Sequence, residues 1–226
     1  TLEILFVNLL TTHLCSKKKY SNTKTSLILS LFTAIVFSLW FLLQPSVFPK
    51  AIFILIGFLY FFPLQYLYHE KPSRIFLIMC FSWTHTITVN AFTVELVKLL
   101  FPSHRYDMVL VLQTILYVLT TYFVIKFIQN KFRIILRYLS SKNNKSLIFL
   151  GIVLFVTVLI LRFYFSIGHP YWILTFIVLI SIIAVSCYRL LYIIVDNSMR
   201  IDTLKKIAYY DDLTGANNRL TLFIDA

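Results

Sequence analysis

Charged residues are scarce in this chain of 226 residues. They make up 13% of it, whereas 59% of the residues are hydrophobic and the mean hydropathy is +0.83. This balance excludes an ordinary soluble domain and indicates that most of the chain lies in a lipid bilayer. Acidic residues are the rarest of the charged ones, with 9 Asp and Glu against 21 Lys and Arg. The basic residues form short tracts between apolar runs rather than one basic surface, so nucleic acid is not an expected partner.

Glycine and cysteine are also rare. Four glycines are few for the broken helices of many transporters, and no internal repeat is evident, so a transporter is disfavoured without being excluded. The three cysteines have no metal-like spacing, and we expect them to be small buried hydrophobes: Cys15, Cys80 and Cys187. The sequence predicts no disulfide framework, no zinc site and no cofactor within this chain.

Long apolar runs dominate the sequence instead. A helix needs about 20 residues to cross the hydrocarbon core of a bilayer. Six runs meet that length, at residues 26–43, 51–68, 75–100, 108–129, 147–165 and 171–195. A seventh run, 2–15, is short for a span and is either a tilted span or an interfacial helix. The predicted fold is therefore an all-α, polytopic membrane helix bundle with six or seven transmembrane helices over residues 1–195.

The basic residues predict the orientation of this bundle. Lys and Arg concentrate in alternate connections, at residues 16–24, 69–74 and 126–145, and after the last span. Because cytoplasmic loops are enriched in Lys and Arg, these connections are expected on the cytoplasmic side. Only four of the 21 basic residues then lie on the other side, namely Lys50, Lys98, Arg105 and Arg162. The C-terminus is expected in the cytoplasm whether or not residues 2–15 span the membrane.

The predicted span 75–100 is more polar than the others. Thr86, Asn90 and Thr93 recur at helical spacing on one face, and His85 and Glu95 are assigned to a second face. Ionisable residues at membrane depth are costly unless they have a partner or face water, which makes them functional-site candidates. The alternative is that the Thr and Asn side chains join helices by hydrogen bonds, and we favour this interpretation for them.

An outward-facing ligand pocket or ion pair is the hypothesis for two charged residues of the outer half. Glu95 and Arg162 are the residues concerned, and the alternative for Arg162 is that its long side chain extends to the headgroups. A lone histidine such as His85 is more often a packing residue than a proton sensor. The candidate sensing residues are His85, Asn90, Glu95 and Arg162.

The chain leaves the last span without a Gly or Pro, so a helical pattern continues over residues 196–210. Apolar residues recur there at alternating spacings of four and three, the seam of a parallel coiled coil. The seam residues are Leu190, Ile194, Asn197, Ile201, Leu204 and Ala208. We expect a signalling helix that pairs in a homodimer, with an amphipathic helix lying on the membrane as the alternative.

A polar segment, IAYYDDLTGANNRL, follows at residues 207–220. Thr214 and Gly215 predict a turn, because Gly ends a helix through positive φ without steric cost, and Asn217 or Asn218 is placed to cap a new helix. Residues 211–219 resemble the D-x-L-T-G-x-x-N-R signature that opens GGDEF domains, the catalytic module of bacterial diguanylate cyclases. The matching residues are Asp211, Leu213, Thr214, Gly215, Asn218 and Arg219.

The resemblance is confined to the C-terminal end of the chain. It implies that residues 211–226 are the first residues of an α/β GGDEF domain, whose metal-binding and guanine-binding residues are expected after residue 226. It also implies a full-length protein that uses Mg²⁺ and condenses GTP into cyclic di-GMP, while the present residues have no catalytic role. The expected function is a sensor module in a bacterial cell membrane that responds to a small ligand or a membrane cue. A transporter or receptor unrelated to cyclic di-GMP is the alternative.

Overall fold

The computed structural model describes residues 2–43, 56–101, 106–142, 145–164 and 169–209. Within these ranges the chain is almost entirely helical, and its only β-type pairing is an isolated bridge between Lys18 and Tyr68. The prediction of an all-helical bundle is confirmed for these residues. The family motif at 211–219 and the predicted start of an α/β domain lie outside them.

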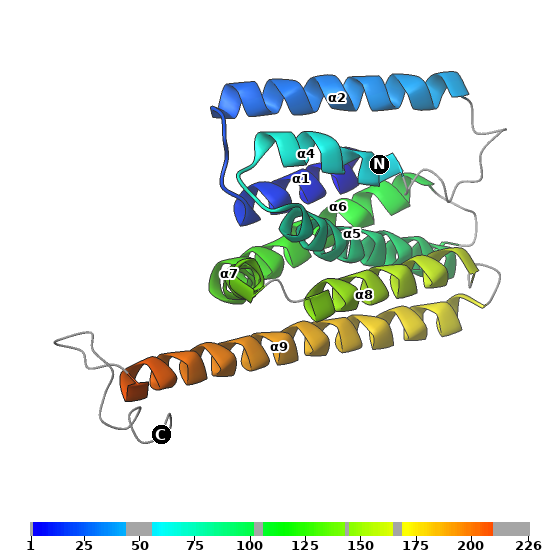
Figure 1. Ribbon diagram of the computed structural model, residues 1–226. Coiled ribbons are helices and arrows are strands. Elements are labelled where there is room, and N and C mark those ends of the chain that lie inside the picture. Colours follow the sequence, from blue (N-terminus) through cyan, green and yellow to red (C-terminus); the bar gives the residue numbers. More distant parts are fainter. Residues whose placement is uncertain (1, 44–55, 102–105, 143–144, 165–168, 210–226) are drawn as a thin grey trace.

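Most helices follow the predicted apolar runs closely (Figure 1). The predicted run 51–68 differs, because its first five residues lie outside the described ranges and the rest forms a 3₁₀ turn and a helix of 7 residues. A short 3₁₀ turn, η1, precedes α4, and a π-helical turn, η2, separates α6 from α7. The elements are α1 (Leu2–Cys15), α2 (Asn22–Leu43), η1 (Gly57–Tyr60), α4 (Phe61–Leu67), α5 (Pro72–Leu100), α6 (Tyr106–Phe127), η2 (Ile128–Phe132), α7 (Arg133–Lys142), α8 (Lys145–Tyr164) and α9 (Pro170–Tyr209).

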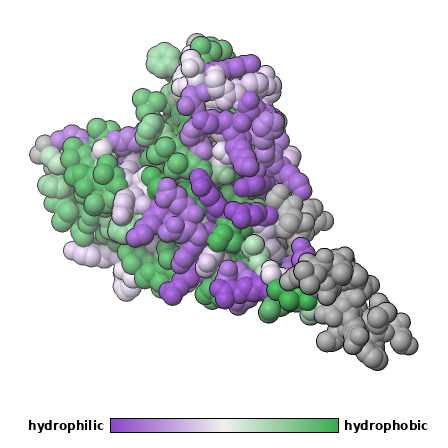
Figure 2. Space-filling view, turned by 90° about the vertical axis from the view of Figure 1, so that its left-hand side faces the viewer, coloured by the Kyte–Doolittle hydropathy of each residue, from purple (hydrophilic) through white to green (hydrophobic). Residues whose placement is uncertain are grey.

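The chain passes back and forth along the bundle, with α5 in the middle and α2 and α9 on opposite outer sides (Figure 1). The three connections that are rich in Lys and Arg, together with the C-terminal end of α9, therefore meet at one end. We call this end the basic end; it is on the left of Figure 1. Figure 2 looks onto it and shows hydrophilic residues gathered across the face.

Four described segments are long and apolar enough to cross a membrane, at Asn22–Leu39, Pro72–Leu100, Asp107–Tyr138 and Pro170–Tyr209. Two shorter apolar helices accompany them, at Leu2–Cys15 and Ile148–Ile160. The structure thus agrees with a membrane protein of several apolar helices. The number of spans, six or seven, stays a prediction.

Helix α1 lies lengthwise inside the bundle rather than at its edge. The side chain of Gln113, near the start of α6, donates to Glu3 at 2.9 Å. At the other end of α1, Arg133 donates to the carbonyl of Leu14 at 3.0 Å. Since its two ends meet residues near the start of α6 and just after its end, α1 runs beside α6 and in the same direction.

The basic connection at residues 126–145 was expected to be a loop, and this expectation is wrong. The chain instead continues from α6 through η2 into α7, which is seen end-on in Figure 1 and so crosses the bundle axis. Phe132, Ile135 and Leu136 are almost fully buried, whereas Arg133 and Arg137 are exposed. An amphipathic helix can bury its apolar face against the bundle while its Arg residues stay in water, so a dense basic charge does not prevent helix formation here.

Candidate functional site

The polar residues predicted in the fourth apolar run lie on α5 and reach the neighbouring helix α6. His85 Nε2 lies 3.0 Å from the Thr120 hydroxyl. Asn90 donates from Nδ2 to Gln113 Oε1 at 2.7 Å. The sequence assigned His85 and Asn90 to separate faces, yet both contact α6. Two long side chains on different flanks of one helix can reach the same neighbour, which spacing alone does not show.

The Asn90 contact extends across three helices. Gln113 is 4% exposed and donates from Nε2 to Glu3 Oε2 at 2.9 Å. The Thr114 hydroxyl donates to the other Glu3 oxygen at 2.5 Å. We call Glu3, Asn90, Gln113 and Thr114 the carboxylate cluster. It joins α1, α5 and α6 at the end of the bundle opposite the basic end.

Sequence reasoning missed Glu3, although it is the cluster's charged member. The only sequence feature that could have indicated its role is that Glu3 is a lone acidic residue at the start of an apolar run. This feature did not identify a site, because the sequence left open whether the short run 2–15 spans the membrane. An ionised carboxylate beside apolar helices needs hydrogen-bond donors, and the Gln113 and Thr114 side chains supply them.

A second set of polar contacts joins α1 to α5 deeper in the bundle. Asn8 Oδ1 accepts hydrogen bonds from the Ser82 and Thr86 hydroxyls, and the Thr86 carbonyl accepts one from Tyr117 at 2.9 Å. Asn8 is 5% exposed and Thr86 is 0% exposed. These contacts favour the interpretation of Thr86 as an interhelical connection. Thr93 differs, since its hydroxyl donates to the Val89 carbonyl of its own helix at 2.7 Å.

Glu95 is 2% exposed and forms an ion pair with Lys98 of its own helix, at 2.7 Å between Oε1 and Nζ. Its second oxygen has no hydrogen-bond partner among the described residues. The Arg162 side chain lies outside the described residues, so the Glu95–Arg162 pair stays a prediction. The structure therefore directs both His85 and Asn90 to α6, at two different residues, and places Glu95 in a separate contact.

A groove of about 600 Å³ lies between α1 and α6, alongside the carboxylate cluster. Apolar residues form most of its walls, and Glu3, Thr114 and Thr121 add polar atoms. A carboxylate beside an apolar wall suits an amphipathic ligand with a cationic or hydrogen-bond-donating head. Among the described residues no group of three or more His, Cys, Asp or Glu side chains could hold a metal ion.

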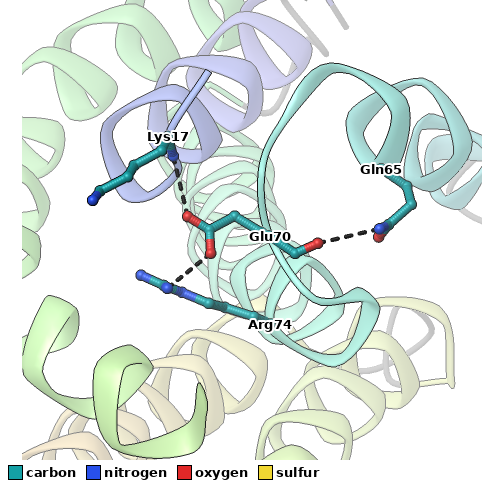
Figure 3. A network of polar contacts seen from close by, with 4 residues as sticks. All are labelled: Lys17, Gln65, Glu70 and Arg74. Carbon is teal, nitrogen blue, oxygen red and sulfur yellow. Dashed lines mark hydrogen bonds and ion pairs between the residues drawn. The ribbon is translucent and has the colours of Figure 1, made fainter. Parts of the chain in front are cut away.

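The basic end carries a polar network of its own (Figure 3). Glu70 accepts a hydrogen bond from the Lys17 backbone N–H at 3.1 Å and forms an ion pair with Arg74 at 2.8 Å. Its carbonyl accepts a hydrogen bond from the Gln65 side chain at 3.2 Å. This Glu70 network joins the α1–α2 connection to the end of α4 and the start of α5.

The signalling helix predicted from the sequence is continuous with the last span. Helix α9 runs for 40 residues, from Pro170 to Tyr209, without a break. All six predicted seam residues are exposed: Leu190, Ile194, Asn197, Ile201, Leu204 and Ala208. The helix therefore presents an uncovered, largely apolar stripe toward the C-terminal end of the structure.

No protein-family model, no curated protein and no solved structure matches this chain. A functional proposal therefore depends on the geometry described above.

Proposed function

We propose that this chain is the membrane input module of a diguanylate cyclase, in which the helix bundle senses a cue and α9 transmits it to a GGDEF domain that begins at residue 211. One observation carries the proposal. The 40 residues of α9 form one helix that enters at the far end of the bundle and passes the basic end (Figure 1). Such a helix is about 60 Å long, twice the roughly 30 Å that a membrane span requires.

An uninterrupted helix transmits movement better than a loop, because displacing one end displaces the other. The cue would shift the bundle between two arrangements, and only a cue that binds one arrangement better than the other has an effect. The carboxylate cluster is the proposed receptor site for it, since it joins three helices, α1, α5 and α6. The exposed stripe on α9 would pair with a second copy and align two GGDEF domains.

The proposed orientation places the basic end in the cytoplasm. The connections rich in Lys and Arg and the C-terminal end of α9 share that end, as the positive-inside rule requires. The lengthwise position of α1 supports seven spans with the N-terminus outside. GTP and Mg²⁺ would bind to the GGDEF domain and not to the bundle.

A chimera tests the proposal directly. Residues 1–209 are joined to a GGDEF domain of known activity, and cyclic di-GMP is measured in membranes supplied with GTP and Mg²⁺. A matched chimera carries one additional residue after Tyr209, which rotates the fused domain by about 100° relative to α9. A third chimera carries Glu3→Gln. The proposal is supported if cyclic di-GMP synthesis changes both in the chimera with the added residue and in the Glu3→Gln chimera. Equal activity in all chimeras would contradict it.

A transporter unrelated to cyclic di-GMP is the second candidate, and the buried polar side chains of α5 are the observation in its favour. Polar groups inside a bundle mark solute pathways in many membrane proteins. Solute uptake by proteoliposomes that contain this chain, lost in Asn90→Leu, would support that alternative. Among the described residues, however, the contacts of Asn90, Asn8 and Thr86 are with neighbouring helices.

A further inference from the structure

A second groove lies on the other side of α1, between α1 and α2. Its volume is about 670 Å³, within the range of roughly 300–1,000 Å³ that small-molecule sites occupy. Leu9 and Leu10 of α1 and Leu29 and Phe37 of α2 supply apolar walls. Helix α2 also turns hydroxyl groups to this groove, while Leu27, Leu31 and Ile35 of the same helix are exposed and lie outside its lining. The hydroxyl-bearing residues are Thr25, Ser26, Ser30 and Thr33.

The polar part of this groove lies at the basic end. His13, Tyr68, Asn22 and Thr25 line it there, and His13 Nδ1 lies 3.1 Å from the Tyr68 hydroxyl. Lys18 is not part of the lining, but its Nζ donates to the side chain of Asn22, which is, so the ammonium group lies beside the polar end of the groove. Thr25 is only 3% exposed, and its hydroxyl has no hydrogen-bond partner among the described residues. A buried hydroxyl without a partner is costly, so it points to a ligand atom.

The mouth of the groove is held in place by the α1–α2 connection. The Lys19 N–H donates to the Leu67 carbonyl at 2.9 Å, and the His69 N–H donates to the Lys17 carbonyl at 2.8 Å. The Lys17 N–H is held by Glu70 of the Glu70 network (Figure 3). Because the backbone around Lys18 is fixed at three points, its charge is preorganised and a ligand does not have to order the loop.

We propose that this groove binds an anionic phospholipid. The phosphate lies at the mouth, where Lys18 offers positive charge and the Thr25 hydroxyl and the His13 ring offer hydrogen-bond donors. One acyl chain lies along the apolar walls. A soluble anion would leave those walls unfilled, and a lipid without an anionic headgroup would leave the charge of Lys18 unneutralised, because Asn22 is a neutral partner. Basic pockets between membrane helices at the cytoplasmic side are suited to acidic headgroups. The inference goes beyond the proposed function and is independent of the GGDEF assignment.

Lipid titration of the purified 226-residue chain in detergent tests the headgroup site. Phosphatidylglycerol is expected to bind at least ten-fold more tightly than phosphatidylcholine of the same chain length. Lys18→Gln weakens phosphatidylglycerol binding roughly five-fold, the effect of removing one basic residue at a membrane surface. Lys206→Gln removes the same charge from α9, away from the groove, and leaves binding unchanged. Equal affinity for both lipids, or equal losses in the two variants, would overturn the proposal.

The acyl-chain site needs a separate test. Ala34 lines the groove, whereas the neighbouring Ile35 is 50% exposed and lies outside its lining. Ala34→Trp is expected to reduce phosphatidylglycerol binding at least ten-fold, and Ile35→Trp to leave it intact, with equal thermal unfolding of both variants. Retained binding in Ala34→Trp contradicts the site. Glycerol phosphate, which has the headgroup without acyl chains, should not displace the lipid; displacement at equal concentration would instead indicate a soluble-anion site.

Discussion

Helices α5 and α9 are both membrane-length helices, but they relate to the rest of the protein in opposite ways. In α5, 67% of the most apolar stretch is buried within the protein, against 17% in α9. Helix α5 carries the polar residues His85, Asn90 and Glu95, whereas 11 of the 23 exposed residues of α9 are Ile, Leu or Val. The more polar helix therefore lies in the centre and the more apolar one at the surface.

This arrangement follows from the solvent. Lipid chains accept apolar side chains at no cost, so a helix rich in Ile and Leu is stable on the outside of the bundle. Hydroxyl and amide groups find no hydrogen-bond partner in lipid and must find one in the protein. The stability of the bundle should therefore depend on contacts of α5, while α9 should tolerate change in isolation and matter for assembly.

The largest difference in the free energy of unfolding is expected between variants of two ion pairs that have the same i,i+4 spacing. Glu70→Ala leaves Arg74 without its partner and should lower the free energy of unfolding by about 2–3 kcal/mol, because the side chain of Glu70 is only 5% exposed. Asp196→Ala breaks the α9 pair with Arg200, whose side chain is 75% exposed, and should cost less than about 0.5 kcal/mol. Unfolding in detergent measures both. Equal losses would contradict the comparison.

A methyl group added against α5 should have the next largest effect. A Cβ atom at Gly57 would lie 2.1 Å from the Trp83 ring, and this ring is buried and stacked on Phe58. Gly57→Ala should therefore destabilise the protein by about 2 kcal/mol. Gly151→Ala is the control, since its Cβ would approach closely only one methyl group, Leu77 Cδ1 at 2.6 Å, and would meet Cys80 Cβ at an ordinary 3.8 Å. The melting temperature should fall less in Gly151→Ala than in Gly57→Ala. A larger fall in Gly151→Ala would contradict the packing described for Trp83.

Loss of a single interhelical hydrogen bond should have a smaller effect. Asn90→Leu removes the bond to Gln113 and is expected to cost about 0.6–1.7 kcal/mol, the range for such bonds in membrane bundles. Asn197→Leu makes the same chemical change on the exposed stripe of α9 and should leave the stability of a single chain unchanged. Reversible unfolding of both variants in the same detergent provides the measurement. A larger loss of unfolding free energy in Asn197→Leu than in Asn90→Leu would show that the stripe of α9 is buried in a contact rather than exposed.

The smallest effect on stability and the clearest effect on assembly are expected on α9. Leu204 is 64% exposed, so Leu204→Asn should change the free energy of unfolding by less than about 0.5 kcal/mol. It should nevertheless reduce cross-linking between two copies, because it places a second polar residue on the seam. Thr203→Asn, one position off the seam, is the matched control. Unchanged cross-linking in Leu204→Asn would favour the alternative in which this helix lies on the membrane.

Periodic features could be predicted from the sequence, and contacts between distant residues could not. Apart from the run 51–68, the apolar runs became helices close to their predicted bounds, and the absence of Gly and Pro between residues 196 and 210 correctly predicted that α9 continues, to Tyr209. The partners of His85 and Asn90 could not be predicted, because Thr120 and Gln113 lie on another helix. The connection 126–145 was wrongly predicted to be a loop. Its many basic residues suggested a solvated loop, although Phe132, Ile135 and Leu136 form an apolar face between them.

The sequence by itself determined that this is a bundle of apolar helices with alternating basic connections, since hydrophobicity and charge are properties of each segment alone. Only the tertiary structure decided that α5 occupies the centre, that Glu3 joins the carboxylate cluster and that Glu70 holds the α1–α2 connection. Each of these depends on which helices become neighbours. Hydrogen bonds and close packing act over a few ångströms between residues up to 119 positions apart in the chain, and no local pattern encodes that pairing.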